Sequence, residues 1–129
     1  MPYKTNANLF ELGDFESHAG LQLAWKIECD AVRPEWWTAL ARMIMDYQLA
    51  PFGSVRGIPT GGLALEAAMQ QYVTPGNYPA LIVDDVYTTG TSFREFKLQH
   101  YPNQTVYQWC IFARQPTANG VRALFTMPG

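Results

Sequence analysis

Charge is scarce in this sequence of 129 residues, in which 9 lysines and arginines stand against 11 aspartates and glutamates, for a formal net charge of −2. There is no basic run, so the composition gives no electrostatic basis for binding nucleic acid or an anionic membrane surface. No apolar stretch is long enough to span a bilayer. The opening residues lack the basic start and apolar middle of a signal peptide.

Cysteine is also rare, with only Cys29 and Cys110, and both lie in apolar, strand-like stretches. We interpret them as two buried free thiols, with a disulfide as the alternative, and expect a cytoplasmic protein. Hydrophobic residues make up 48% of the chain. This content predicts one globular domain over residues 1–129.

The pattern of apolar residues predicts strands that alternate with helices. Residues 21–29 alternate between apolar and polar side chains, which is typical of a half-buried strand. An amphipathic helix is predicted over 35–48, where apolar residues recur on one face. Further strands are predicted at 52–55, 80–83, 106–113 and 121–127, and further helices at 63–72 and from the loop after residue 87 to about 99. This alternation predicts an α/β fold with a doubly wound, mostly parallel sheet flanked by helices.

Two adjacent acids follow a buried strand in the stretch LIVDDVYTTGTS, residues 81–92. In an open α/β sheet, ligands bind outside the carboxyl ends of the strands, where we expect Asp84 and Asp85 to lie. A pair of carboxylates suits a vicinal diol or a magnesium ion. The stretch therefore predicts a site for one of these ligands.

A loop of hydroxyl residues comes directly after the acids and leads into the start of a helix. Its backbone amides, hydroxyls and helix dipole would favour a phosphate group, and a glycine would let the backbone approach it closely. The alternative is an ordinary capped helix after a buried strand. The residues of this predicted phosphate loop are Thr88, Thr89, Gly90, Thr91 and Ser92.

The full stretch resembles the phosphoribosyl-pyrophosphate (PRPP) loop of type I phosphoribosyltransferases. The resemblance implies that Asp84 and Asp85 hold the ribose hydroxyls, that residues 88–92 cradle the 5-phosphate, and that Mg²⁺ is held mainly through PRPP, near the two acids. A second stretch, VRGIPTGG at 55–62, resembles the family's pyrophosphate loop. It implies that Arg56, Gly57 and Gly61 contact the pyrophosphate; alone, this loop could also be an ordinary strand-to-helix turn.

The amino-terminal stretch FELGDFESHAGLQLAWKIE, residues 10–28, resembles the opening of orotate phosphoribosyltransferases. The resemblance implies a short hood-like segment over 1–30 and a core over 31–129, and touches most of the chain from 10 to 115. Lys26 stands where that branch has an aromatic residue. Lys26, Tyr87 and Arg114 are the candidate base-binding residues, with packing the alternative for Tyr87 and a solvated strand-end cation the alternative for Arg114.

The mobile catalytic loop of the family has no counterpart in this sequence. Family members usually place a strand and a cation-bearing loop between the pyrophosphate-loop helix and the acid-bearing strand. Here no lysine, arginine or histidine occurs from Gly57 through Phe93. Fixed cations stabilise the departing pyrophosphate, so their absence predicts reduced transferase activity.

The sequence thus leads to three hypotheses for function. The first is a phosphoribosyltransferase that binds Mg-PRPP and transfers ribose 5-phosphate to a nitrogenous base such as orotate. The second is a non-catalytic module that binds PRPP or a nucleotide, and the third is a PRPP hydrolase. We also expect a homodimer, because the adjacent Trp36 and Trp37 on one helix suggest an exposed aromatic face.

Overall fold

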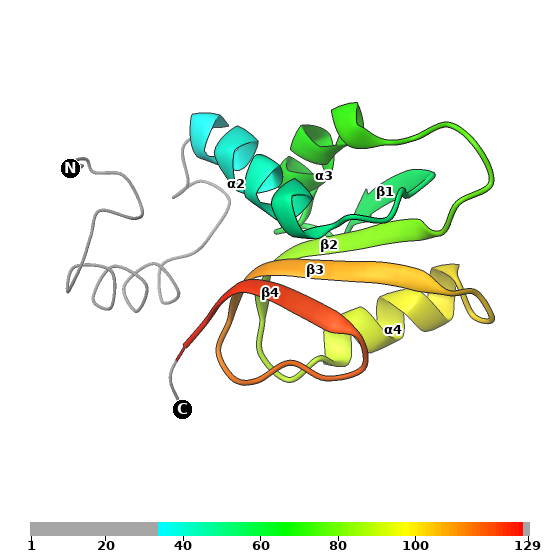
Figure 1. Ribbon diagram of the computed structural model, residues 1–129. Helices are drawn as coiled ribbons and strands as arrows, with labels where there is room; N and C mark the ends of the chain where they lie inside the picture. Colours follow the sequence, from blue (N-terminus) through cyan, green and yellow to red (C-terminus); the bar gives the residue numbers. More distant parts are fainter. Residues whose placement is uncertain (1–33, 128–129) are drawn as a thin grey trace.

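The computed structural model describes residues 34–127 and contains a four-stranded sheet in which all neighbouring strands are parallel. The strands lie in the order β1-β2-β3-β4 (Figure 1). The elements are α2 (Pro34–Tyr47), β1 (Ser54–Gly57), α3 (Leu63–Met69), the 3-10 helix η2 (Gln70–Tyr72), β2 (Ala80–Tyr87), α4 (Thr91–His100), β3 (Val106–Ala113) and β4 (Val121–Thr126). The predicted α/β fold with a parallel sheet is confirmed.

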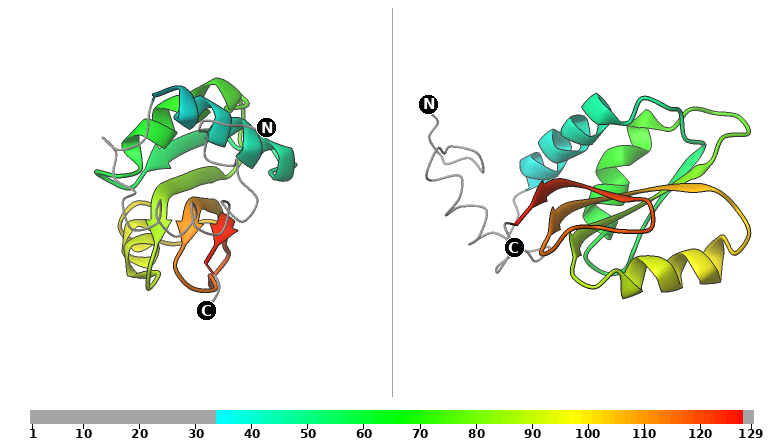
Figure 2. Two further views of the ribbon diagram at one scale, coloured as in Figure 1. Left: turned by 90° about the vertical axis from the view of Figure 1, so that its left-hand side faces the viewer. Right: turned by 60° about the horizontal axis from the view of Figure 1, so that its bottom comes forward.

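Helices cover both faces of this sheet because alternate residues of each strand point to opposite sides. Leu81 and Val83 of β2 pack in one hydrophobic cluster with α2 and α3, whereas Ile82 packs in a second cluster with α4. Figures 1 and 2 show the same arrangement, with α2 and α3 on one face and α4 on the other. The sheet is therefore doubly wound, as predicted.

The sequence predicted most elements within two residues of their observed bounds. The helix predicted over 35–48 is α2, and the strand predicted over 106–113 coincides with β3. The strand predicted at 80–83 was too short, because β2 stays paired with β3 through the acids as far as Tyr87. The predicted strand at 21–29 lies outside the described residues.

Other predictions concern single side chains. Cys110 is a buried free thiol, as predicted, and burial raises its pKa; Cys29 lies outside the described residues. Trp36 is only partly buried beside the fully packed Trp37, and the predicted dimer stays a prediction. Within residues 34–127, no helix is both long and apolar enough to cross a membrane.

Candidate functional site

The two acids stand at the carboxyl end of β2, where the sheet narrows. Strand β1 ends with Gly57 opposite Val83, so β2 continues past it without a neighbour on that side. The backbone N–H of Asp85 donates to Asp84 Oδ1, and that of Val86 donates to Asp85 Oδ1, each at 2.8 Å. Asp84 is only 7% exposed, whereas Asp85 is half-buried. Asp85 therefore offers the more accessible carboxylate of the pair.

The glycine loop at 57–62 turns back against these acids. It is anchored to β2 by a hydrogen bond from Ile58 N–H to the Val83 carbonyl, at 2.9 Å. A Cβ atom added at Gly61 would lie 2.5 Å from Asp85 Oδ2, so only glycine lets the backbone come this close. The structure thus brings together the glycine loop and the acid pair, which the sequence predicted separately, with Gly61 directly opposite Asp85.

Sequence reasoning missed the residue that fixes the start of this loop. Glu66 Oε1, from the first turn of α3, accepts a hydrogen bond from Gly57 N–H at 2.7 Å. A Cβ atom on Gly57 would lie 2.1 Å from the Gly62 carbonyl oxygen, so the loop closes tightly on itself. An acid in the first turn of the helix after a glycine loop is the signal that could have identified Glu66.

The predicted phosphate loop connects β2 to α4 and exposes Thr88, Thr89 and Ser92 to solvent. Gly90 is the residue that precedes the helix, and its φ of +87° is one that L-residues rarely adopt. Among the described residues, the backbone N–H groups of Ser92 and Phe93 have no hydrogen-bond acceptor. Free first-turn amides at a helix start are suited to an anion, and the binding of a phosphate here stays a prediction.

Arg56 lies on the α4 face of the sheet, away from the buried Val55. Its guanidinium carbon is 5.6 Å from the centroid of the Phe96 ring on α4. This is a cation–π contact, and Arg56 forms no ion pair with any residue in the described part of the chain. To reach a pyrophosphate at the glycine loop, the side chain would have to leave this ring, so its predicted role stays a prediction.

The three candidate base-binding residues are placed very differently. Tyr87 is 4% exposed and packs under the phosphate loop, where its hydroxyl accepts a hydrogen bond from Ala118 N–H at 3.2 Å, an environment that fits the packing alternative. Arg114 is exposed just after β3, and its backbone N–H donates to the Tyr87 carbonyl. Lys26 lies outside the described residues.

The acid pair has an unusual charge state. The pKa of Asp84 is raised from its ordinary value of 3.8 to about 8, first by burial and then by the hydrogen bond to and repulsion from Asp85. Backbone hydrogen bonding to Asp85 opposes the rise but does not cancel it. Near neutral pH Asp84 therefore stays largely protonated, since burial and a neighbouring carboxylate both disfavour its charged form.

This raised pKa predicts that stability falls as pH rises. Between pH 4 and pH 8 Asp84 ionises in the unfolded chain but stays protonated in the folded one, so its contribution is full below pH 4 and lost through pH 8. The slope should approach about 1.4 kcal/mol per pH unit. Denaturant unfolding of the wild type and Asp84→Asn at pH 5 and pH 8 measures how the free energy of unfolding changes with pH. In the variant this change should be much smaller. Asp46→Asn, which removes an exposed carboxylate on α2, should keep the wild-type change; equal slopes in all three proteins would refute the shift.

Comparison with known proteins relates this arrangement to a known fold. No family model matches the sequence, and no curated protein does. Among solved structures, orotate phosphoribosyltransferase from Aeropyrum pernix aligns with a TM-score of 0.54 and 23% identity, over 72% of this chain and 71% of that one. Xanthine-guanine-hypoxanthine phosphoribosyltransferase from Helicobacter pylori aligns with a TM-score of 0.50 and 14% identity, over 71% of this chain and 80% of that one.

This chain has the type I phosphoribosyltransferase fold. The family resemblance found in the sequence is thus confirmed at the level of the fold. We call Gly57 to Gly62 the pyrophosphate-loop segment and Thr88 to Ser92 the PRPP-loop segment, after the roles that the sequence predicts for them; both roles stay predictions. Both lie at the carboxyl ends of neighbouring parallel strands, where α/β sheets bind their ligands.

Magnesium is the cofactor that the phosphoribosyltransferase resemblance implies. Within residues 34–127, no three His, Cys, Asp or Glu side chains are grouped to hold a metal ion by themselves. Asp84 and Asp85 supply oxygen ligands of the kind that Mg²⁺ prefers, and Asp85 presents its carboxylate toward Gly61. Two acids fit an ion that takes its remaining ligands from water and substrate phosphates, which agrees with the expectation that Mg²⁺ would be held mainly through PRPP.

The segment between α3 and β2, where the sequence predicted that the catalytic lid of the family is lacking, is short and compact. The segment between α3 and β2 holds only η2 and a turn over residues 73–79. Thr74 N–H donates to the Phe52 carbonyl and Gly53 N–H to the Pro79 carbonyl, both at 2.9 Å, so the turn is tied to the entrance of β1. This places it at the amino ends of the strands, opposite the edge that carries Asp84 and Asp85.

Proposed function

We propose that this protein binds PRPP, together with Mg²⁺, at the carboxyl ends of β1 and β2, and transfers ribose 5-phosphate to a nitrogenous base. The observation that carries the proposal is the contact between the glycine loop and Asp85 of the acid pair. Asp85 of the acid pair faces Gly61 of the pyrophosphate-loop segment, and the open amides of Ser92 and Phe93 follow at the start of α4. One edge of the sheet thus offers acceptors for a diol beside two places for phosphate groups.

The chain's own residues would mainly bind and orient the substrate. The Asp85 carboxylate would accept hydrogen bonds from the ribose hydroxyls, with Asp84 behind it. Residues 88–92 would hold the 5-phosphate through backbone N–H groups, and the Gly57–Gly62 loop would leave room for the pyrophosphate. Bound magnesium would neutralise charge on the leaving group. We propose orotate as the acceptor, on the resemblance of residues 10–28 alone.

A binding module that lacks chemistry is the second candidate. Two observations favour it: Gly57 to Phe93 contains no lysine, arginine or histidine, and the Arg56 guanidinium lies over Phe96. The acids and the amides suffice to recognise ribose 5-phosphate, whereas cleavage of the anomeric bond needs cations on the departing pyrophosphate. The hydrolase hypothesis requires the same chemistry with water as acceptor.

The double variant Asp84→Asn/Asp85→Asn tests the shared basis of all three candidates. Each hydrogen bond to a charged acceptor is worth roughly 1.5–3 kcal/mol, so affinity for PRPP or ribose 5-phosphate should fall by at least about tenfold. Isothermal calorimetry with Mg-PRPP measures this directly. The fold should survive, because amides replace acids of nearly equal size at the end of a strand.

Glu95→Gln provides the matched control, because it removes an exposed carboxylate from α4 without touching the acid pair. Its affinity for Mg-PRPP should equal that of the wild type. If the double variant also binds with unchanged affinity, the diol assignment fails. Pyrophosphate release that a base accelerates, release that is equal with and without a base, or no release then separates transferase, hydrolase and binding module.

A further inference from the structure

A cavity of about 300 Å³ lies on the α4 face of the sheet, between α4 and the connection from β3 to β4. Parallel strands usually need a crossover of about a dozen residues or more, most often with a helix. Here residues 114–120 alone join β3 to β4, without a helix, so within residues 34–127 no helix from this connection covers this part of the face. The cavity is large enough for a small organic ligand, since such pockets start at about 300 Å³.

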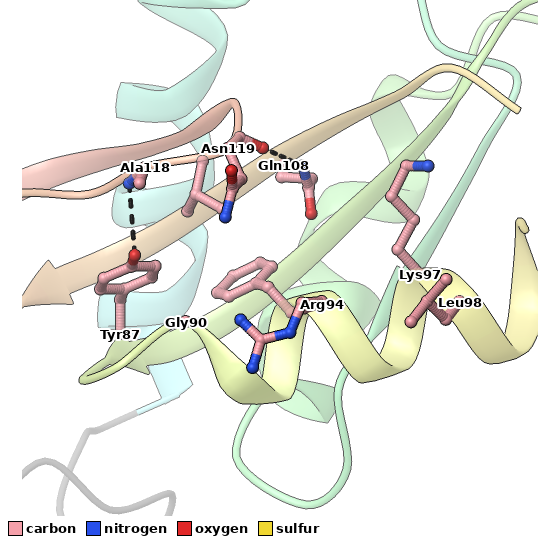
Figure 3. A pocket seen from close by; sticks show the side chains of 10 residues that line it. Tyr87, Gly90, Arg94, Lys97, Leu98, Gln108, Ala118 and Asn119 are labelled. Atoms are coloured by element: carbon pink, nitrogen blue, oxygen red, sulfur yellow. Dashed lines mark hydrogen bonds between the residues drawn. The ribbon is translucent and has the colours of Figure 1, made fainter.

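A buried amide is aimed into this cavity. Gln108 of β3 is only 6% exposed, and its Nε2 donates to the Asn119 carbonyl at 3.1 Å. That bond fixes the orientation of the amide, because a carbonyl can only accept. Its Oε1 therefore points into the cavity, as Figure 3 shows, and has no hydrogen-bond donor among the described residues. A buried acceptor without a donor is costly, so a ligand that carries an N–H or O–H group is favoured here.

Two cations border the same cavity from α4. Arg94 makes one long hydrogen bond, to Thr91 Oγ1 at 3.4 Å, and neither Arg94 nor Lys97 forms an ion pair within residues 34–127. The apolar lining comes from Phe93, Val121 and Leu98, the last of which is 61% exposed. The cavity thus combines an apolar wall, one buried acceptor and two cations.

We propose that this cavity is a second ligand site, for a small, flat, anionic molecule with an N–H or O–H donor. Its apolar ring would lie on Phe93 and Val121, its donor would bond to Gln108 Oε1, and its carboxylate or phosphate would meet Arg94 and Lys97. The cavity borders the phosphate loop, since Tyr87 and Gly90 line part of it, but its polar centre is Gln108 on β3, outside that loop. It does not depend on the proposed function, since neither Asp84 nor Asp85 lines it.

Indole-2-carboxylate is a suitable probe, because it places an N–H donor and a carboxylate on one flat ring. Its binding can be measured by nuclear magnetic resonance titration of the full chain, alongside N-methylindole-2-carboxylate, which lacks the donor, and indole-2-carboxamide, which lacks the charge. Each of the two altered probes should bind roughly tenfold more weakly than the parent. Equal affinity for all three would overturn the proposal.

Variants locate the probe in the cavity. Gln108→Leu should lower the affinity for indole-2-carboxylate until it equals the affinity for the N-methyl compound. Lys97→Gln should lower the affinity for both compounds and leave the ratio between them unchanged. Lys97→Gln keeps the test valid if Gln108→Leu does not fold. Arg42→Gln, which removes an exposed cation on α2, should leave binding unchanged. Competitive displacement by ribose 5-phosphate, or full binding to Lys97→Gln, would overturn the assignment.

Discussion

Gly90→Val should reduce binding of the 5-phosphate by more than about 100-fold, because several charge-assisted hydrogen bonds of about 1.5–3 kcal/mol are lost together. Gly90 has a φ of +87°, which costs other L-residues about 1–2 kcal/mol and a β-branched residue more. A Cβ atom at this position would also lie 2.7 Å from the Tyr87 hydroxyl oxygen. The loop would have to move, and its amides would no longer converge. Calorimetry with ribose 5-phosphate measures the loss.

Gly120→Val is the matched control for this variant. Gly120 has a similar φ of +82°, but a Cβ atom there meets its nearest neighbour, Gln108 Nε2, at 3.6 Å, and the residue lies outside the phosphate loop. It should share the backbone strain and keep phosphate affinity. If Gly90→Val still holds a phosphate or sulfate ion on residues 88–92 in a crystal, or if both variants lose affinity equally, the predicted cradle is wrong.

Transfer of ribose 5-phosphate to orotate should be slow even though PRPP binds. Each missing cation on the leaving group costs a factor of about 100 to 1,000 in rate. Relative to a typical enzyme turnover of about 10 per second, we therefore expect less than about 0.1 per second. An open site also admits water, so some PRPP should be hydrolysed without a base. Pyrophosphate release with and without orotate measures both reactions.

The Asp84→Asn/Asp85→Asn variant is the control for this measurement, because it should abolish release that arises at the proposed site. A turnover near 10 per second in the wild type would overturn this prediction, because it would show that transfer runs without a lid within Gly57–Phe93. It would also show that a cation reaches the pyrophosphate from elsewhere, either from Arg56 after it leaves Phe96 or from residues outside 57–93.

Local patterns predicted the fold because the spacing of apolar residues in β2, β3 and α2 is typical of a strand or of a helix. Burial on both faces marked residues 80–83 as a parallel strand, and a single apolar stripe marked 35–48 as a helix. The end of β2 was missed because Asp84 and Asp85 look like a loop, although hydrogen bonds to β3 continue through them. Such pairing depends on a neighbouring strand and cannot be inferred from local periodicity.

The candidate site was predictable in its parts but not in its assembly. Motifs identified the acids, the phosphate loop and the glycine loop, and parallel topology implied one common edge. The closeness of Gly61 to Asp85, the hydrogen bond from Gly57 to Glu66 and the direction of Arg56 are tertiary facts. Alternation shows that Arg56 and Val55 face opposite ways, but it does not say which helix covers which face. The cavity at Gln108 was not foreseen, because it follows from a connection that has no helix.

The placement of α3 and α4 on opposite faces has a consequence for the handedness of the chain path. Strands β1, β2 and β3 follow one another in one direction across the sheet, so crossovers on opposite faces must have opposite hands. Viewed along the strands (Figure 2, left), the crossover through α3 is the left-handed one, although about 98% of such connections are right-handed. A strand inserted between α3 and β2 on the outer edge of β1 would restore the usual hand. The left-handed crossover and the predicted lack of a lid thus depend on the same feature, the short connection between α3 and β2.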